Sequence, residues 1–220
     1  MISATGDTIL SVGMTGGIAC GRTTVCAILA RLGACVVDMD AVAHTLMAPG
    51  GGAVAEVAGA FGARYVDPIG GIDRKSLGTL VFGDRDSRKR LEGILHPMIL
   101  DEAQKIIEEF AATKGRGIAV SDAALLVETG GYRRYDRLVV VFCEPRLQLR
   151  RLMTRDNLNE TDALARIAAQ APLDEKKAVA DYLIDTSATL ADTETRTHEL
   201  YAMLLEDLER LPDLPERVKR

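Results

Sequence analysis

The 220-residue chain lacks several features that would assign it to a specialised class of protein. No apolar run approaches the roughly 20 residues that cross a bilayer. No basic segment followed by an apolar stretch opens the N-terminus, so we expect no secretory leader. The net charge of −5 argues against a protein that coats nucleic acid, because such proteins are usually basic. No internal repeat or low-complexity segment interrupts an ordinary globular composition.

Cysteine is scarce and scattered, which argues against a metal or dithiol motif. None of the four cysteines forms a C-x-x-C pair, and no histidine stands near one at metal-ligand spacing. We therefore expect reduced thiols and a cytoplasmic location. Because Cys20 lies inside a glycine-rich segment, its thiol is expected to be exposed and oxidisable. The cysteines are Cys20, Cys26, Cys35 and Cys143.

The stretch VGMTGGIACGRTT, residues 12–24, nearly matches the phosphate-binding pattern G-x-x-x-x-G-K-[ST]. Gly16, Gly21 and Thr23 fit, whereas Arg22 occupies the lysine position. Backbone N–H groups in such a loop, together with the N-terminus of the next helix, bind anions. Thr23 could supply a hydroxyl to Mg²⁺, and Arg22 keeps the positive charge as a longer planar fork. The alternative is a glycine turn that binds nothing.

The flanking segments favour the phosphate interpretation. A short apolar run, residues 9–12, predicts a strand, and residues 23–32 have the apolar periodicity of a helix ended by Gly33. Alternation of strands and helices further along predicts a parallel α/β sheet with ligands at the carboxyl ends of the strands. Further strands are expected at residues 34–40, 117–126, 137–143 and 180–185. Further helices are expected at residues 42–47, 53–61, 75–82, 86–95, 97–110, 146–155, 160–170 and 189–210.

Two aspartates follow the second predicted strand. If residues 34–40 are extended, Asp38 and Asp40 lie on one face with Met39 opposite. A carboxylate there could accept a proton from a hydroxyl during phosphate transfer or bind a metal through water. The alternative is that Asp40 caps the helix expected to begin near Val42.

Arginines cluster on the helix that follows the 137–143 strand. Arg146 and Arg150 share one face at i, i+4 spacing, as do Arg151 and Arg155. They form either a solvated surface or, on a mobile segment, a clamp for the charge of a transferring phosphoryl group. His96 precedes Pro97, which is expected to begin a helix, so a cap or packing role suits His96 better than catalysis.

Taken together, these motifs resemble the dephospho-CoA kinase family over roughly residues 9–204. Besides the glycine loop, the resemblance rests on VVDMDAVAH, FGARYVDPIGGIDRKSLGTLVF, RLEGILHPMI, DAALLVE, RLMTRD and RIAAQAPLDEKKAVADYLIDTS. It implies transfer of the γ-phosphate of ATP, with Mg²⁺, to the ribose 3′-hydroxyl of dephospho-CoA. It also implies a P-loop NTPase parallel sheet flanked by helices, with a helical acceptor-binding insertion and a helical lid. The implied parts are a core (1–40, 114–145 and 180–210), an insertion (41–113) and a lid (146–179).

The resemblance also assigns roles residue by residue. Asp40 corresponds to the proposed base and Thr23 to the Mg²⁺ ligand, while Arg22, Arg151 and Arg155 complete the catalytic set. The acceptor region corresponds to Asp40, Arg74, His96, Leu126 and Glu128. The nucleotide region corresponds to Gly16, Gly17, Ala19, Cys20, Gly21, Arg22, Thr23, Thr24, Asp185 and Thr186.

The chain departs from the family pattern at several positions. Arg22 replaces lysine, and Ala19 replaces a glycine that would matter if the loop needs a positive φ there. Cys20 and Thr23 stand where serines are common, Ala124 where a proline is, and Thr186 where an asparagine is. These departures leave two other hypotheses open: a non-catalytic nucleotide- or CoA-binding protein, and a kinase for another nucleoside or nucleotide hydroxyl. In each case we expect small-molecule ligands and a monomer or small homo-oligomer.

Overall fold

The structure, a computed structural model, describes residues 8–211 and divides the chain into two compact units. The first, which we call the sheet unit, comprises the described residues up to 37 and from 109 onward. The second, the helical unit, comprises residues 38–108.

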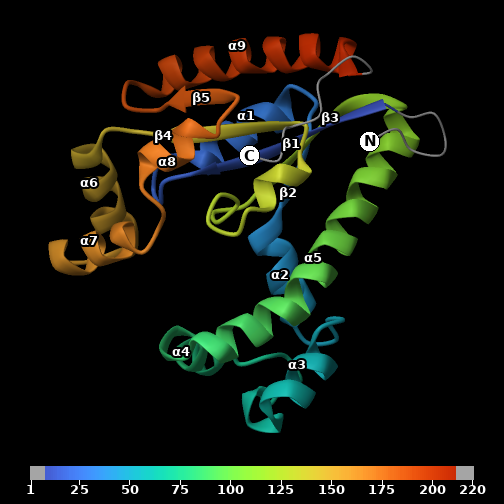
Figure 1. The fold of residues 1–220 in the computed structure, drawn as a ribbon, viewed down its shortest axis with the longest axis vertical. Coiled ribbons are helices and arrows are strands. Elements are labelled where there is room, and N and C mark those ends of the chain that lie inside the picture. Colours follow the sequence, from blue (N-terminus) through green and yellow to red (C-terminus); the bar gives the residue numbers. More distant parts are fainter. Residues whose placement is uncertain (1–7, 212–220) are drawn as a thin grey trace. The chain divides into compact units, whose positions relative to one another are not determined.

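The sheet unit is built on five strands in the order β2-β3-β1-β4-β5 (Figure 1). The pairs β1–β3, β1–β4 and β4–β5 are all parallel, as predicted. The continuous apolar run of β4 is buried, as expected for a strand covered on both faces. The strands are β1 (Thr8–Gly16), β2 (Cys35–Asp38), β3 (Arg116–Asp122), β4 (Arg137–Phe142) and β5 (Tyr182–Asp185).

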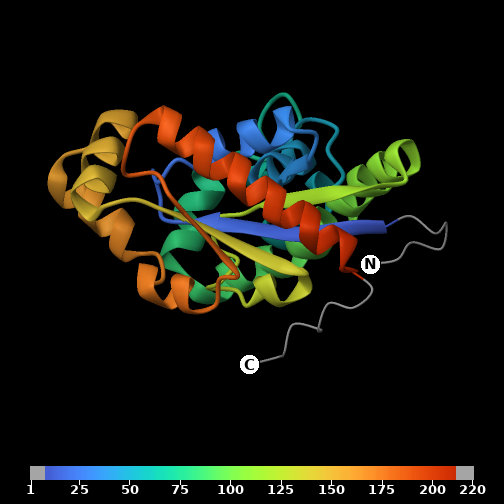
Figure 2. The same cartoon turned by 90° about the horizontal axis from the view of Figure 1, so that it is seen from above.

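Two helices, α1 (Arg22–Arg31) and α9 (Leu190–Glu209), cover one face of this sheet. Figure 2 shows α9 crossing above the strands. Their apolar side chains meet those of β1, β3 and β4 in the main core, where burial of each leucine contributes about 1.5–3 kcal/mol. A capping box starts α9: Thr189 accepts from the Asp192 backbone N–H, and Asp192 accepts from that of Thr189.

The opposite face is covered by the segments after β3 and before β5. Leu126, Leu138 and Val140 form a second cluster there, joined by side chains from η2 (Gly131–Arg134) and α8 (Leu173–Ala178). The helix α8 has no counterpart among the predicted helices. The strand predicted over residues 117–126 ends at Asp122 and continues as turns.

Beyond the carboxyl end of β4, the chain forms α6 (Pro145–Asp156) and α7 (Glu160–Ala168), which pack against each other (Figure 1). Pro145 is the first residue of α6, where its missing N–H costs nothing. Asn157 ends the helix in the left-handed conformation, with φ of 51°. Asp156, the last residue of α6, pairs with its neighbour Arg155 and with Arg166 of α7, and the second pair joins the two helices.

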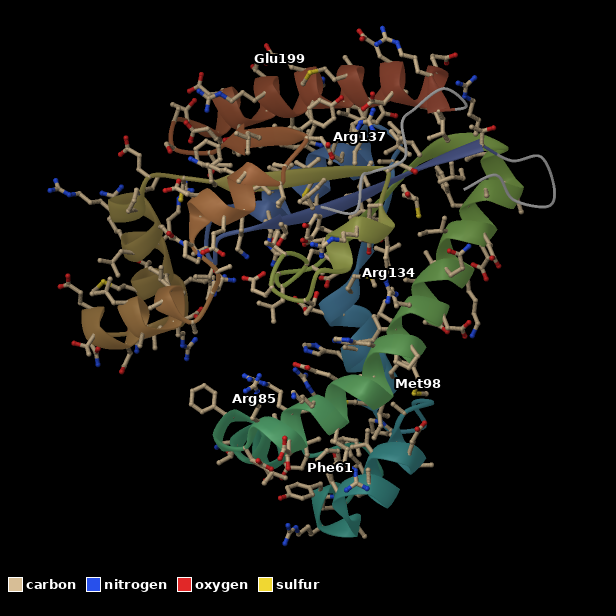
Figure 3. The ribbon with its side chains drawn as sticks, in the orientation of Figure 1. Phe61, Arg85, Met98, Arg134, Arg137 and Glu199 are labelled. Atoms are coloured by element: carbon tan, nitrogen blue, oxygen red, sulfur yellow. The ribbon has the colours of Figure 1, made fainter. Side chains whose placement is uncertain are left out.

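The helical unit consists of α2, α3, a short 3₁₀ turn η1, α4 and most of α5, around a core of its own. Phe61 and Met98, labelled in Figure 3, pack against this core from α3 and α5. The prediction of two helices, 86–95 and 97–110, was wrong: α5 runs through Pro97 without a break. These elements are α2 (Met39–Met47), α3 (Val54–Phe61), η1 (Ala63–Tyr65), α4 (Arg74–Gly83) and α5 (Arg85–Lys114).

Within residues 8–211, no helix combines the length and apolar character that a membrane span requires.

Candidate active site

The glycine loop occupies the carboxyl end of β1 and leads directly into α1. At Gly16 an added Cβ would lie 2.1 Å from the carbonyl oxygen of Val141 on the neighbouring strand, so no larger residue fits. Gly21, the N-cap of α1, has φ of 85°, which favours glycine. Both motif glycines are therefore required by the backbone that carries the loop.

Ala19 lies in the same loop with φ of 60°. This left-handed conformation brings the Cβ of an L-residue close to the following carbonyl oxygen and costs roughly 1–2 kcal/mol. The position is thus one that glycine would occupy without strain. Ala19 and Gly21 together give the loop two left-handed residues in the three before α1.

The side chain of Arg22 pairs with Asp122 through Nη1 and a carboxylate oxygen. Asp122 is the last residue of β3, and both side chains are largely buried, with 18% and 12% of their surfaces exposed. The guanidinium is therefore held at the carboxyl edge of the sheet. A guanidinium has five N–H donors, so contact with Asp122 uses only part of its capacity.

Two glutamines hold the backbone of the loop at Ile18. The Ile18 N–H donates to Oε1 of Gln170 at 2.7 Å, and the Gln148 amide donates to the Ile18 carbonyl at 3.0 Å. Gln148 belongs to α6, and Gln170 follows α7. Contacts from α6 and from the residues after α7 therefore fix the backbone of the glycine loop at Ile18.

Arg151 of α6 contacts the residue after β5. Its two terminal nitrogens donate to the hydroxyl and carbonyl oxygens of Thr186, each at 3.1 Å. The Thr186 hydroxyl donates to the Cys20 carbonyl at 2.8 Å, so the predicted nucleotide residue Thr186 is buried and bonded to the loop. Arg155 lies elsewhere, exposed and paired with Asp156.

The other residue expected near the nucleotide, Asp185, is the last residue of β5. Its carboxylate accepts from the backbone N–H and hydroxyl of Ser187 and pairs with Arg196. Burial opposes the charged form, but these bonds and the nearby cations lower the pKa of Asp185 below its ordinary value. The carboxylate is therefore charged at neutral pH.

Glu128 and Leu126, predicted to contact an acceptor, both have partners within the sheet unit. Glu128 accepts from Nζ of the fully buried Lys176 at 2.6 Å and from the Ala171 N–H at 2.9 Å. Burial would raise the pKa of Glu128, but these two bonds lower it overall. Leu126 is 7% exposed and packs in the second core cluster.

In the helical unit, the predicted placement of Asp38 and Asp40 on one strand face was wrong. Extended structure ends at Asp38, and Met39 already begins α2. Asp38, not Asp40, caps that helix by accepting from the Ala41 N–H at 2.9 Å. Asp40 is exposed in the first turn of α2, one turn before His44.

Arg74, at the start of α4, donates to Nε2 of His44. Because arginine carries no acceptor, this contact requires the unprotonated nitrogen of the imidazole. His96 is exposed on α5 rather than placed before a helix, which corrects the expectation that Pro97 begins one. The structure thus brings Arg74 to His44, a residue for which no role was predicted.

The residues at the loop fit a magnesium ion held partly by phosphate. Mg²⁺ in kinases takes one or two protein oxygens and completes its shell with phosphate oxygens and water. Thr23 is exposed in the first turn of α1, and Asp122 ends the adjacent β3. No group of three His, Cys, Asp or Glu side chains within residues 8–211 could hold a metal by itself.

Comparison with known proteins identifies the family. The family model for dephospho-CoA kinase matches residues 10–192. A dephospho-CoA kinase of Geobacter sulfurreducens is 44% identical over 191 residues, covering 87% of this chain and 96% of that protein. The chain belongs to the dephospho-CoA kinase family. Another dephospho-CoA kinase, from Cutibacterium acnes, is 41% identical over 84% of this chain and 80% of its own length.

Solved structures agree with this membership. A crystal structure from Thermus thermophilus has 30% sequence identity and a TM-score of 0.75, covering 90% of this chain and 98% of its own. A dephospho-CoA kinase from Campylobacter jejuni has 25% identity and a TM-score of 0.56, covering 91% and 97%. The predicted P-loop kinase fold, a parallel sheet flanked by helices, is confirmed.

Several residues that contact the glycine loop or Glu128 were not predicted to be part of the site of this dephospho-CoA kinase. Gln148, Gln170 and Lys176 act on the loop and on Glu128 from far along the chain, through contacts that no local motif announces. Asp122 gave a partial signal, because it is an acidic residue in the strand expected over residues 117–126, and the carboxyl end of a parallel strand lies at the ligand-binding edge of the sheet. Its pairing with Arg22 depends on the loop being folded.

Proposed function

We propose that the chain transfers the γ-phosphate of ATP to the ribose 3′-hydroxyl of dephospho-CoA, giving CoA in the last step of CoA biosynthesis, in the cytoplasm. One observation supports this proposal above the others: the chain contains a loop with phosphate-loop geometry and matches dephospho-CoA kinases over nearly its full length. The loop backbone, with Gly16 and Gly21 where only glycine is suited, supports binding of a polyphosphate.

The nucleotide end of the reaction would use the loop, Arg22 and Thr23. Backbone N–H groups of the loop and of the N-terminus of α1 would bind the β- and γ-phosphates, apart from those of Ile18, Cys20 and Thr24, which donate within the protein. Arg22 contacts the same phosphates while Asp122 fixes its direction, since a guanidinium can serve two acceptors. The hydroxyl of Thr23 would hold Mg²⁺, which would neutralise phosphate charge when bound. The adenine is assigned to the segment containing Asp185 and Thr186.

The acceptor end is assigned to the helical unit. Asp40 is exposed in the first turn of α2, and its carboxylate would orient the 3′-hydroxyl and accept its proton. Arg74 and His96 would contact the acceptor, since both side chains are exposed. Phosphoryl transfer needs positioning and charge stabilisation more than covalent chemistry, so these contacts account for much of the catalysis we propose.

Residues 146–179 are proposed to act as the lid. Arg151 already lies at the loop through Thr186, and Arg155 would turn from Asp156 to the phosphates when the lid closes. Both guanidiniums would stabilise charge on the transferring group. Glu128 and Leu126 are assigned to shaping the acceptor side, since Lys176 and the core hold them in place.

The decisive experiment is a coupled assay of CoA formation from ATP, Mg²⁺ and dephospho-CoA. Asp40→Asn should lower turnover more than tenfold, equivalent to more than about 1.4 kcal/mol of barrier. The matched control is Asp38→Asn, because Asp38 caps the same helix and is given no part in the reaction. Failure of the unaltered protein to form CoA would refute the proposal, and normal turnover in Asp40→Asn would remove Asp40 from its role.

Arg22 separates this proposal from a non-catalytic binding protein. Arg22→Lys should stay within tenfold of the unaltered enzyme, whereas Arg22→Met should lose about 100-fold or more of turnover. A large gain in Arg22→Lys would mean that the native loop is impaired. Calorimetry that detects nucleotide binding without turnover would favour the non-catalytic protein. A panel of nucleoside and nucleotide acceptors tests the remaining alternative of a different hydroxyl substrate.

A further inference from the structure

Two of the four cysteines face each other beneath the phosphate loop. The sulfur of Cys20, in the loop, lies 3.4 Å from that of Cys143, the residue after β4. Both are free thiols, with only 2% and 1% of their surfaces exposed. The expectation that Cys20 is exposed was therefore wrong, because its side chain points inward to Cys143. The loop and the end of the neighbouring strand thus meet through two oxidisable atoms.

The surroundings of the two thiols shift their pKa values in opposite directions. Interaction with the Cys20 thiol lowers the pKa of Cys143 to about 7, against the effect of burial and with help from the Arg151 guanidinium. The pKa of Cys20 is raised, first because it shares a hydrogen bond with Cys143 and then because it is buried. At neutral pH, Cys143 is therefore the nucleophile of the pair, and Cys20 holds the proton.

The other two cysteines lie in different surroundings. Cys26 faces inward from α1, and its sulfur lies 3.4 Å from that of Met14. Cys35 is half-buried at the start of β2, where burial raises the pKa of its thiol. Only the Cys20–Cys143 pair combines a close second sulfur with a neighbouring cation among the residues that the structure describes.

We propose that Cys20 and Cys143 form a reversible disulfide on exposure to a hydroperoxide, and that this bond slows phosphoryl transfer by displacing the phosphate loop. The effect on catalysis rests on the function proposed above, whereas formation of the bond does not. Such reversible disulfides are the form in which cytoplasmic proteins use cysteine pairs for redox sensing.

The chemistry is a two-electron oxidation. The Cys143 thiolate attacks one oxygen of hydrogen peroxide, the O–O bond breaks, and the departing hydroxide takes a proton to become water. The resulting sulfenic acid is attacked at sulfur by Cys20, which loses its proton, and the second oxygen leaves as water. Two thiols and one peroxide therefore give one disulfide and two waters. A dithiol reductant reverses the reaction by thiol–disulfide exchange.

Closure of the bond would move the loop. A disulfide needs an S–S distance of about 2.0 Å, so the sulfurs must approach by about 1.4 Å from 3.4 Å. Cys20 lies between the left-handed residues Ala19 and Gly21, and its carbonyl accepts from Thr186. Displacement of Cys20 therefore shifts the adjoining loop N–H groups. Because a shift of about 1 Å can cost about 100-fold in rate, we expect a loss of about 10- to 100-fold.

Peptide mapping tests the bond without relying on activity. Trypsin places each cysteine in a separate peptide, with Cys20 in residues 1–22 and Cys143 in residues 138–146. Reduced protein is treated with hydrogen peroxide, alkylated and digested. We expect a cross-linked peptide of 1–22 with 138–146, lost after dithiothreitol. Oxidation of the Cys35 thiol serves as the control that the peroxide has reacted. Absence of the cross-linked peptide in a sample where Cys35 is oxidised would overturn the proposal.

Activity assays on variants test the consequence. Cys143→Ser and Cys143→Ala should keep basal activity within about twofold and resist peroxide, since serine and alanine cannot form the bond. The matched control, Cys35→Ser, should lose activity as the unaltered enzyme does and recover with dithiothreitol. Equal peroxide sensitivity in the Cys143 variants, or full activity of the mapped disulfide form, would overturn the regulatory effect. If the reduced protein forms no CoA, the proposed function is refuted. Peptide mapping still tests formation of the disulfide in that case, because it does not depend on activity.

Discussion

Ala19 offers a direct test of the loop geometry, because glycine at this position should stabilise the protein. Its φ of 60° is a conformation that glycine adopts without strain. Ala19→Gly removes only a methyl group and leaves every hydrogen bond of the loop in place. The change in the free energy of unfolding therefore reports the backbone strain at this single residue.

The magnitude follows from two opposing effects. Relief of the left-handed conformation favours the folded state by roughly 1–2 kcal/mol. Glycine also increases the entropy of the unfolded chain, which offsets about 0.4–1 kcal/mol of that gain. The midpoints of the two ranges differ by about 0.8 kcal/mol, which would raise the melting temperature by about 2–3 °C in a chain of this size.

Urea denaturation followed by circular dichroism measures this difference, since the chain has no tryptophan to report by fluorescence. Ala27→Gly is the matched control, because Ala27 is exposed in the middle of α1, where glycine costs about 1 kcal/mol. The same chemical change should thus have opposite signs eight positions apart. Equal destabilisation by both substitutions would refute the left-handed conformation of Ala19.

Three further substitutions test contacts in the two units. Glu128→Gln should destabilise the protein at neutral pH, because buried Lys176 loses its counterion. The lowered pKa of Glu128 contributes stability that is present above about pH 4.3 and is lost as the pH falls through the pKa of the folded state. The urea midpoints of the variant and the unaltered protein should therefore converge in acid. Asp207→Asn should cost about 3 kcal/mol in urea denaturation, because it leaves Arg137, which lies between β4 and α9 in Figure 3, without its carboxylate. Asp73→Ala should destabilise α4 by removing the side chain that caps it, which lowers the urea midpoint measured by circular dichroism.

The fold was predictable where the signal is local. Continuous β-branched runs such as residues 137–143 are typical of buried parallel strands, and β4 occupies residues 137–142. The prediction failed where a local pattern had two solutions. Residues 34–40 alternate as a strand would, but Asp38 can satisfy the first N–H groups of a helix, and α2 begins at Met39.

Pro97 shows a second kind of failure. Proline removes one helical hydrogen bond and crowds the preceding turn, so a boundary is the expected outcome. Here α5 continues because residues on both sides of Pro97, Leu95 and Met98, pack into the core of the helical unit. Tertiary packing outweighs the local cost, and nothing in the neighbouring sequence reveals that balance.

The candidate site also contains some residues that local sequence predicts and others that it does not. Gly16 and Gly21 were predictable because their role depends on the backbone of one short loop. The contacts of Gln148 and Gln170 with Ile18 join residues more than 100 positions apart, so only the folded chain shows them. Side chains that position a loop from a distance have no spacing rule of their own.

The contact between Arg22 and Asp122 gives a physical reason to expect that arginine can serve in place of the motif lysine. Asp122 is largely buried, and loss of its cation would leave a carboxylate in a poorly hydrated place. A lysine ammonium is a compact point charge, so moving toward phosphate weakens its hold on a neighbouring carboxylate. The planar fork of Arg22 can contact Asp122 through one nitrogen and direct its other N–H groups at phosphate oxygens. The substitution therefore keeps both the charge of the loop and the pairing of Asp122, which is why we expect Arg22 to support catalysis.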